Sequence, residues 1–325
     1  LYGYPLDGVV LTTGCDKTTP AALMAACTVN LPAIILSGGP MINGYHKGKK
    51  IGSGTIVWEA RRMHARGEIN YSEFIDLVAK GSPSIGHCNT MGTASSMNSI
   101  AEALGMSLTG SAIIPAPYKE RETISFETGK RIVKMVHEGL TPSKIMTKEA
   151  FENAIYVASA IGASSNCPPH LTAIARHMGI DLDIDSWQKL GHDIPLLVNC
   201  QPAGEHLMEG FFKAGGIPAI MQELMKNNKL HKNVMTVTGK TVEENLNIKI
   251  DVDGNVRGLG LMLFPPFGPY QGTPVFEVQL RSNAAGDLLS FKYYDASEDA
   301  VLDIVETYEF IINDILGDVI NPIFF

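Results

Sequence analysis

The stretch that decides the fold is Gly8-Val9-Val10-Leu11-Thr12-Thr13-Gly14-Cys15-Asp16-Lys17-Thr18-Thr19-Pro20. Its apolar start predicts a short strand, and Thr19-Pro20 predicts a helix start, because threonine caps helices and proline is favoured in their first turn. Helix-forming residues fill 21–26, and Ala33-Ile34-Ile35-Leu36 predicts a second buried strand. Strand, helix and strand in this order predict a βαβ unit with two parallel strands.

The alternation of strand and helix signals continues to about residue 245. Apolar positions at helical spacing predict helices over 55–66, 71–80, 93–104, 126–138, 147–160, 168–178, 205–214 and 217–227. Short apolar runs predict further strands at 111–115 and 195–198. We therefore expect an α/β fold in which a parallel sheet carries helices on both faces.

Residues 246–325 differ sharply in composition from the rest of the chain. They hold 12 acidic and four basic side chains, whereas the first 245 residues hold 22 of each, together with all nine histidines and all five cysteines. Alternating apolar positions predict strands at 248–252, 275–280 and 288–294, with a turn at 253–255. We expect one domain over 1–246 and a small, acidic, antiparallel β-rich module, sandwich-like in form, over 247–325.

Composition and charge argue against several classes of protein. The net charge of −8 argues against nucleic acid as a partner, since such binding needs clustered lysine and arginine. The sequence contains no run of 18 apolar residues of the kind that predicts a membrane span. Its start at Leu1-Tyr2-Gly3 has neither a basic signal-peptide region nor an initiator methionine. We expect the chain to begin mid-protein. Five scattered cysteines suit reduced thiols, so we expect a cytoplasmic location without membrane contact.

One candidate site is Thr13-Gly14-Cys15-Asp16-Lys17-Thr18, between a predicted strand end and a predicted helix start. Ligand sites of open α/β sheets gather at that edge. A thiol, a carboxylate and an amine in three consecutive positions are compatible with a redox thiol, an activated nucleophile or a set of metal ligands. An ordinary polar loop is the alternative.

A second candidate is Gly86-His87-Cys88-Asn89-Thr90-Met91-Gly92-Thr93-Ala94-Ser95-Ser96-Met97-Asn98, which leads into another predicted helix. Small residues there allow a backbone to approach a ligand, and a helix start offers free N–H groups to an anion. A capped helix with a buried cysteine is the alternative. Cys15 and Cys88 lie too far apart in sequence for their spacing to indicate a local zinc or cluster motif.

Both segments, with others, resemble one known family, the dihydroxy-acid and sugar-acid dehydratases, which are iron–sulfur hydro-lyases. The resemblance covers residues 1 to about 245. The arabinonate and xylonate branch is the most similar, because Gly86-His87-Cys88-Asn89-Thr90-Met91 differs from the Gly-Ala-Cys-Gly-Gly-Met usual in dihydroxy-acid dehydratases. The other words that carry the resemblance are Gly14-Cys15-Asp16-Lys17-Thr18-Thr19-Pro20-Ala21, Leu36-Ser37-Gly38-Gly39-Pro40-Met41, Ala101-Glu102-Ala103-Leu104-Gly105-Met106, Val198-Asn199-Cys200-Gln201-Pro202 and Ala214-Gly215-Gly216-Ile217-Pro218.

The resemblance implies a lyase that dehydrates a sugar acid of carbohydrate metabolism to a 2-keto-3-deoxy acid. It implies that Cys15 and Cys88 ligate an iron–sulfur cluster, 2Fe-2S rather than 4Fe-4S. It also implies that Asp16 and Lys17, the latter as a carbamate with oxygen ligands, bind Mg²⁺. Substrate contacts are expected from His87, Thr90, Ser164, Ser165 and Asn166. The family also suggests a homo-oligomer.

Two departures from the family lead to an alternative function. No segment here matches the family's third cluster cysteine, its Mg²⁺-binding glutamate or the serine that acts as its base, so the chain is predicted to be a fragment with impaired turnover. The alternative is a catalytically incomplete dehydratase scaffold fused to a secretion or adhesion-type β-module.

Several other residues have structural explanations. Ser164, Ser165 and Asn166 would equally serve to cap the helix predicted from residue 168. Cys167 and Cys200 are predicted to be buried structural thiols. The Gly38-Gly39-Pro40 segment is predicted to be a tight turn, because it lacks a phosphate-binding motif.

Overall fold

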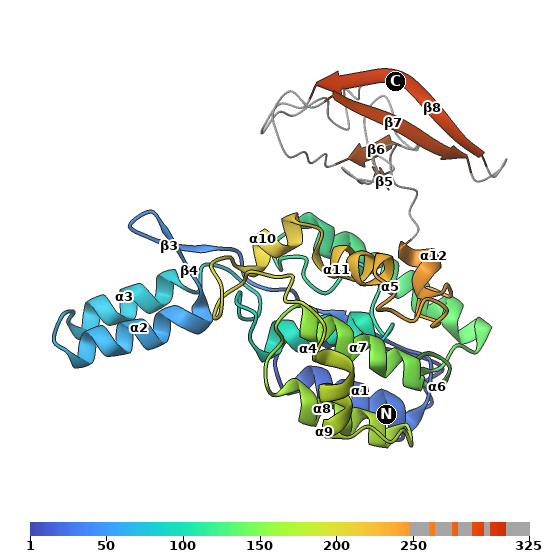
Figure 1. Cartoon of the computed structure of the whole chain (residues 1–325), viewed down its shortest axis with the longest axis horizontal. Coiled ribbons are helices and arrows are strands. Elements are labelled where there is room, and N and C mark those ends of the chain that lie inside the picture. Colours follow the sequence, from blue (N-terminus) through green and yellow to red (C-terminus); the bar gives the residue numbers. More distant parts are fainter. Residues whose placement is uncertain (247–259, 264–274, 279–287, 296–299, 310–325) are drawn as a thin grey trace. The chain divides into compact units, whose positions relative to one another are not determined.

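The computed structural model describes residues 1–246 and four strands of the later chain, at 260–263, 275–278, 288–295 and 300–309. The chain divides into two compact units, Leu1–Leu246 and Asn247–Phe325 (Figure 1). Each unit is described by itself. In the described residues no helix combines the length and the apolar character needed to cross a membrane.

The first unit begins with the predicted βαβ unit. Strand β1 (Val9–Thr13) leads into helix α1 (Thr18–Val29), which returns to strand β2 (Ala33–Ser37). The two strands are parallel, with Val9 opposite Ala33 and Thr13 opposite Ser37. Leu23 of α1 and Ile34 of β2 are fully buried, so the unit closes on an apolar interior. The prediction of a parallel α/β start is confirmed.

Helices form most of the rest of the first unit. The predicted helices correspond to α2 (Ser53–Ala65), α3 (Tyr71–Lys80), α4 (Thr93–Ala103), α5 (Lys119–Glu138), α7 (Lys148–Ala160), α8 (Cys167–His177), α10 (Met208–Lys213) and α11 (Gly216–Lys226). Five elements of the first unit were not predicted: strands β3 (Gly44–His46) and β4 (Lys49–Ile51), which form a hairpin, and helices α6 (Pro142–Ile145), α9 (Ile184–Gly191) and α12 (Val242–Leu246). All five are short.

Helix α4 is the centre of the first unit. Every residue from Ala94 to Ala103 is buried, and the helix packs against α1, α7 and α11 (Figure 1). Met97 and Ile100 of α4 join Phe151 of α7 in the main apolar core. Helix α4 begins five residues after Cys88, so the core fixes the segment that carries this cysteine.

The predicted strands at 111–115 and 195–198 are wrong. Both segments are irregular, and the parallel sheet described in the first unit has two strands. The reason at 110–114 is that side chains satisfy the backbone: Glu102 accepts from the amides of Gly110 and Ala112, and Arg121 donates to the Ser111 carbonyl. At 195–198, Leu196 is 62% exposed, as a buried parallel strand would not be.

Helices α2 and α3 form a hairpin that lies to one side of the rest of the first unit, next to the β3–β4 hairpin (Figure 1). They have a small apolar core of their own, made by Ile56, Ala60 and Leu77. Asn70 and Glu73 form a reciprocal capping box at the start of α3. Because Ser53 opens α2, this hairpin also contributes to the surroundings of Cys88.

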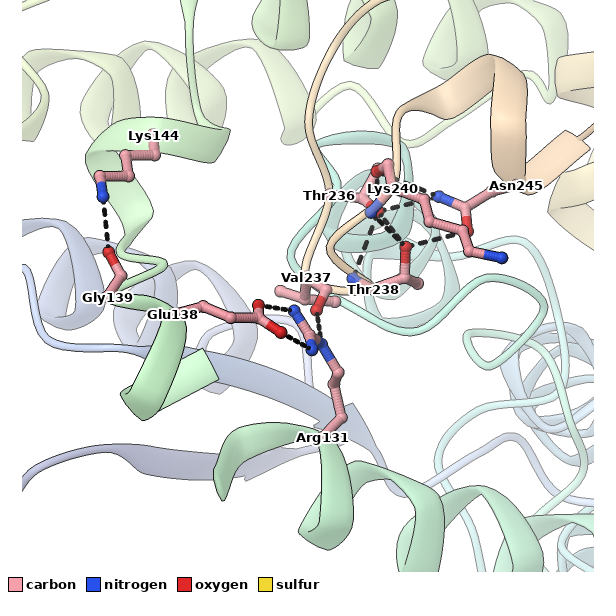
Figure 2. A network of polar contacts seen from close by, with 9 residues as sticks. All are labelled: Arg131, Glu138, Gly139, Lys144, Thr236, Val237, Thr238, Lys240 and Asn245. Carbon is pink, nitrogen blue, oxygen red and sulfur yellow. Dashed lines mark hydrogen bonds and ion pairs between the residues drawn. The ribbon is translucent and has the colours of Figure 1, made fainter. Parts of the chain in front are cut away.

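The C-terminal end of the first unit is held by a polar network (Figure 2). Arg131 of α5 donates through Nε to the Val237 carbonyl at 2.5 Å and forms a bidentate ion pair with Glu138. Asn245 of α12 donates to Thr236 Oγ1 at 2.9 Å and accepts from Thr238 Oγ1 at 2.9 Å. These bonds tie the turn at 236–240 both to α5 and to the last helix of the unit.

In the second unit, β5 (Gly260–Leu263) pairs with β6 (Val275–Val278), and β7 (Leu288–Asp295) pairs with β8 (Ala300–Glu309). Both pairs are antiparallel. The strands predicted at 275–280 and 288–294 correspond to β6 and β7, whereas β5 and β8 were not predicted. The strand at 248–252 and the turn at 253–255 lie outside the described residues, and a sandwich-like packing stays a prediction.

Candidate functional site

The first cysteine lies in the loop between β1 and α1. Cys15 is exposed, and its Sγ lies 3.2 Å from Asp16 Oδ1. The Cys15 amide donates to Thr18 Oγ1 at 3.1 Å, and the Thr19 amide donates to the Cys15 carbonyl at 3.3 Å. Lys17 occupies the N-cap position of α1 and is exposed. The thiol, the carboxylate and the amine therefore share one accessible loop.

The second cysteine is half-buried and is surrounded by hydroxyl groups. Cys88 Sγ lies 3.1 Å from Ser53 Oγ and 3.0 Å from Thr90 Oγ1. The buried Asn89 fixes Ser53, because its Oδ1 accepts from the Ser53 amide at 2.8 Å. Hydroxyl donors at these distances are suited to a sulfur that carries negative charge when it binds a metal.

Ser53 is a residue that the sequence analysis missed as part of the site. The signal was the word Gly52-Ser53-Gly54, in which two glycines flank a hydroxyl. A Cβ added at Gly54 would lie 2.5 Å from Thr90 Oγ1 and 3.0 Å from Cys88 Sγ. The helix start can therefore approach Cys88 only because Gly54 has no side chain.

His87 lies between the two cysteine loops. Its Nδ1 is 3.0 Å from the Cys88 carbonyl, which can only accept, so Nδ1 carries the proton. Burial lowers the pKa of His87 to about 4, and the neutral ring accepts at Nε2 from Asn98 Nδ2 at 3.1 Å. On the other side, a Cβ at Gly14 would lie 3.9 Å from His87 Cδ2. Gly14, which precedes Cys15, and His87, which precedes Cys88, are therefore close to each other.

The segment Gly38-Gly39-Pro40 holds the backbone of His87. The His87 amide donates to the Gly39 carbonyl, and the Met41 amide donates to the His87 carbonyl, both at 2.9 Å. Gly39 has φ +85°, and a Cβ there would lie 2.3 Å from the Ile114 carbonyl oxygen. The predicted tight turn is wrong, because 38–39 are irregular and Pro40 forms a bridge with His87, but the backbone at Gly39 does require glycine.

The structure places two of the three residues at 164–166 beside the start of α4. Ser164 Oγ lies 2.7 Å from Thr93 Oγ1, and Asn166 Nδ2 donates to the same oxygen at 3.0 Å. Ser165 is exposed and makes neither contact. Asn166 occupies the N-cap position of α8, as the alternative predicted, but its side chain makes no cap hydrogen bond.

His170, in the first turn of α8, lies near the Cys15 loop. Burial lowers its pKa, and the Lys17 ammonium lowers it further, whereas the Asp16 carboxylate raises it. Its Nε2 is buried and has no hydrogen-bond partner among the described residues. The contact of α1 with α8 explains how these residues come together.

The other three cysteines have the properties of structural thiols. Cys27, Cys167 and Cys200 are buried. Burial raises the pKa of Cys27 and of Cys167 to about 12 and that of Cys200 to about 11. Such thiols stay protonated at neutral pH. The prediction that Cys167 and Cys200 are buried is confirmed.

The donor types at the two loops suit an iron–sulfur cluster and a divalent cation, since thiolates bind iron and carboxylates bind Mg²⁺. Their number is smaller than a complete site needs. Within the part of the chain that the structure describes, no three side chains among histidine, cysteine, aspartate and glutamate come together to hold a metal ion. The described residues of the two loops therefore do not form a complete metal site by themselves.

Comparison with known families identifies the first unit. Residues 1–245 match the family model described as "Dihydroxy-acid/6-phosphogluconate dehydratase N-terminal". The chain belongs to this family. The resemblance inferred from the sequence words is thus confirmed, and the two cysteine loops lie within the matched dehydratase region.

Curated relatives of this dehydratase-family chain include sugar-acid dehydratases. A D-xylonate dehydratase from Caulobacter vibrioides is 58% identical over 246 residues, covering 76% of this chain and 41% of the relative. An L-arabinonate dehydratase from Rhizobium leguminosarum bv. trifolii is 52% identical over 240 residues, covering 74% and 42%. The chain therefore spans less than half the length of these two relatives.

A more distant relative aligns further along the chain. A dihydroxy-acid dehydratase from Acetivibrio thermocellus is 40% identical over 285 residues, which covers 87% of this chain and 50% of the relative. This coverage exceeds the 246 residues of the first unit, so the alignment extends into the second unit.

Proposed function

We propose that this chain is part of an enzyme that removes water from a sugar acid, an aldonate such as arabinonate or xylonate, to give a 2-keto-3-deoxy acid. The observation that carries the proposal is the 58% identity to a D-xylonate dehydratase across the first unit. The 52% identity to an L-arabinonate dehydratase supports the same substrate class. The named substrates of both relatives are five-carbon sugar acids.

In this proposal Cys15 and Cys88 are two ligands of an iron–sulfur cluster, preferably 2Fe-2S, and Asp16 with a carbamylated Lys17 binds Mg²⁺. When bound, the two groups supply positive charge for the oxygens that become negative as the proton and the hydroxyl leave. Exposure of Cys15 and Lys17 leaves this loop accessible to such groups. Ser53 and Thr90 fix the position of the Cys88 sulfur through their hydroxyl groups.

A polyol substrate needs hydroxyl and amide partners, and the start of α4 offers them. Thr93, Ser164 and Asn166 lie within hydrogen-bond distance of one another, and Ser165 is exposed next to them. We propose that Ser164, Ser165 and Asn166 contact substrate hydroxyls. Thr90 is buried, and its hydroxyl lies against the Cys88 sulfur. We therefore propose that Thr90 affects the substrate indirectly, by fixing the position of that sulfur.

The test is iron binding and turnover in the purified chain. Anaerobic reconstitution with iron and sulfide should give visible absorbance, and xylonate or arabinonate should be assayed for keto-acid formation. Cys15→Ser and Cys88→Ser should each reduce bound iron, whereas Cys27→Ala, a buried thiol away from both loops, serves as the matched control and should retain it. Equal iron in all four proteins would contradict the cluster assignment.

We also propose a domain boundary at 246/247. The family match ends at residue 245, and the first compact unit ends at Leu246. Limited proteolysis followed by mass spectrometry should give a stable fragment ending close to Leu246. A first cut within 1–240 would contradict this boundary.

A further inference from the structure

A line of hydrogen bonds runs from the Cys88 loop to the Cys15 loop. It begins at the Cys88 carbonyl, which accepts from His87 Nδ1, and continues from His87 Nε2 to the side chain of Asn98. Asn98 Oδ1 accepts from Thr19 Oγ1 at 3.1 Å, and the Thr19 amide donates to the Cys15 carbonyl at 3.3 Å. Thr13 Oγ1, at 3.5 Å from Asn98 Oδ1, supports the same end.

The middle of this line is enclosed. Asn98 is 1% exposed, Thr19 is fully buried and Thr13 is 6% exposed. A buried amide needs partners for both its oxygen and its nitrogen, and here the nitrogen serves one loop while the oxygen serves the other. Reversing the amide would place a donor against Thr19 and an acceptor against the His87 lone pair. The two loops therefore determine the orientation of Asn98 together.

We infer that His87 is a positioning residue, which with Asn98 and Thr19 forms a strut that sets the separation of the Cys15 and Cys88 loops. Both ring nitrogens of His87 are engaged within the protein, so neither is free for a substrate. This inference deepens the proposed function and rests on it, since the strut holds the two proposed cluster ligands.

The geometry explains why a strut is needed. Cys88 is held by the core through α4, whereas the Cys15 loop is exposed and its other side-chain bonds, to Asp16 and Thr18, are local. Two thiols that share one compact cluster must keep a fixed separation. Asn98 projects from the buried helix and is the residue that ties the exposed loop to it.

Amide hydrogen exchange on the full chain, without added iron, tests the strut. His87→Ala and Asn98→Ala should each speed exchange at the amides of Thr19 and Ala21, which bond to the carbonyls of Cys15 and Lys17, by about tenfold. The double variant should exchange no faster than either single variant, because all three break one line of bonds. If the two substitutions only destabilised the fold independently, their effects on the exchange rate would instead add up in the double variant.

Asn153→Ala is the matched control. Asn153 is as buried as Asn98 and also uses both ends of its amide, but its partners are the backbone groups of His231. The Asn153→Ala variant should have a lower free energy of unfolding, but amide exchange at residues 15–21 should stay the same. If His87→Ala does not fold, Thr19→Val tests the strut from the other end, with faster exchange expected at Asn89 and Met91.

Unchanged exchange at 15–21 in both His87→Ala and Asn98→Ala would overturn the strut, and so would an equal change in Asn153→Ala. The outcome is separate from the proposed function. A chain that binds no iron and forms no keto acid but shows the coupled exchange would contradict the dehydratase proposal and leave the strut in place. A chain that binds iron and forms keto acid, but whose exchange at 15–21 does not respond to His87→Ala or Asn98→Ala, would contradict the strut and leave the dehydratase proposal in place.

Discussion

The two cysteine loops are built in different ways. Cys15 is exposed, and its hydrogen bonds to Asp16 and Thr18 span at most three positions in sequence. Cys88 is half-buried, and its sulfur is held by Ser53, 35 positions away, as well as by Thr90. A locally held loop can adjust when a ligand binds, whereas a loop held from a distance has its geometry set by the core. In the proposed cluster site, Cys88 would therefore supply the ligand whose position the core sets, and Cys15 the ligand on the more adjustable loop.

The largest expected effect comes from filling the space beside Cys88. Gly54→Ala places a Cβ 2.5 Å from the oxygen of the buried Thr90, so we expect a loss of about 1–3 kcal/mol in the free energy of unfolding. Gly14→Ala is the matched change at the other loop, where the nearest atom would be 3.9 Å away, and it should cost less than about 0.5 kcal/mol. Urea unfolding measures both, and equal losses would remove the proposed difference between the loops.

A second prediction concerns pH and the far end of α4. Burial raises the pKa of Glu102 to about 7. A carboxyl whose folded pKa is raised holds its proton in the folded state after the unfolded chain has released it, so stability falls as pH rises from about 4.5 to about 7. Glu102→Gln should flatten this part of the profile, as measured by urea midpoints at several pH values. A profile unchanged by this substitution would show that Glu102 does not titrate in this range.

The same pH change should act unequally on the two loops. Glu102 accepts from the amides of Gly110 and Ala112 and lies on the helix that follows Cys88. Exchange at these two amides should change between pH 5 and pH 7, after correction for intrinsic rates, while exchange at Thr19 should not. A matching change at Thr19 would mean that protonation of Glu102 affects the Cys15 loop as well, which would contradict the expected difference between the loops.

Smaller effects are expected from removing single hydroxyls. Ser53→Ala removes hydrogen bonds to Cys88 Sγ and Asn89 Oδ1 and should cost about 1 kcal/mol, with faster alkylation of Cys88 by iodoacetamide. Thr18→Ala, at the exposed loop, should cost about 0.5 kcal/mol or less and leave alkylation of Cys88 unchanged. Alkylation rates that respond to both changes alike would contradict the distinction.

These differences also explain what the sequence could predict. The Cys15 loop depends on residues next to it, so its place between β1 and α1 followed from the local pattern of apolar residues, threonine and proline. The Cys88 sulfur has a partner in Ser53 of α2, and no local pattern links Ser53 to this cysteine. Asn98 lies in the predicted segment, but its sequence position does not show that it contacts His87. The same holds for 111–115, where an apolar run predicted a strand but Glu102 and Arg121 take its backbone bonds.

The most direct test of the central claim, that the two loops form one site, is cross-linking of the apo chain with dibromobimane, a short reagent that joins two thiols. Cys15 and Cys88 should be linked within a single chain, as identified by peptide mass spectrometry, because the ligands of one compact cluster lie within about 10 Å of each other. Cys88→Ser should abolish the link, and Cys27→Ala should preserve it. If the reaction goes to completion and Cys15 and Cys88 each carry a separate reagent molecule with no link between them, the claim is contradicted.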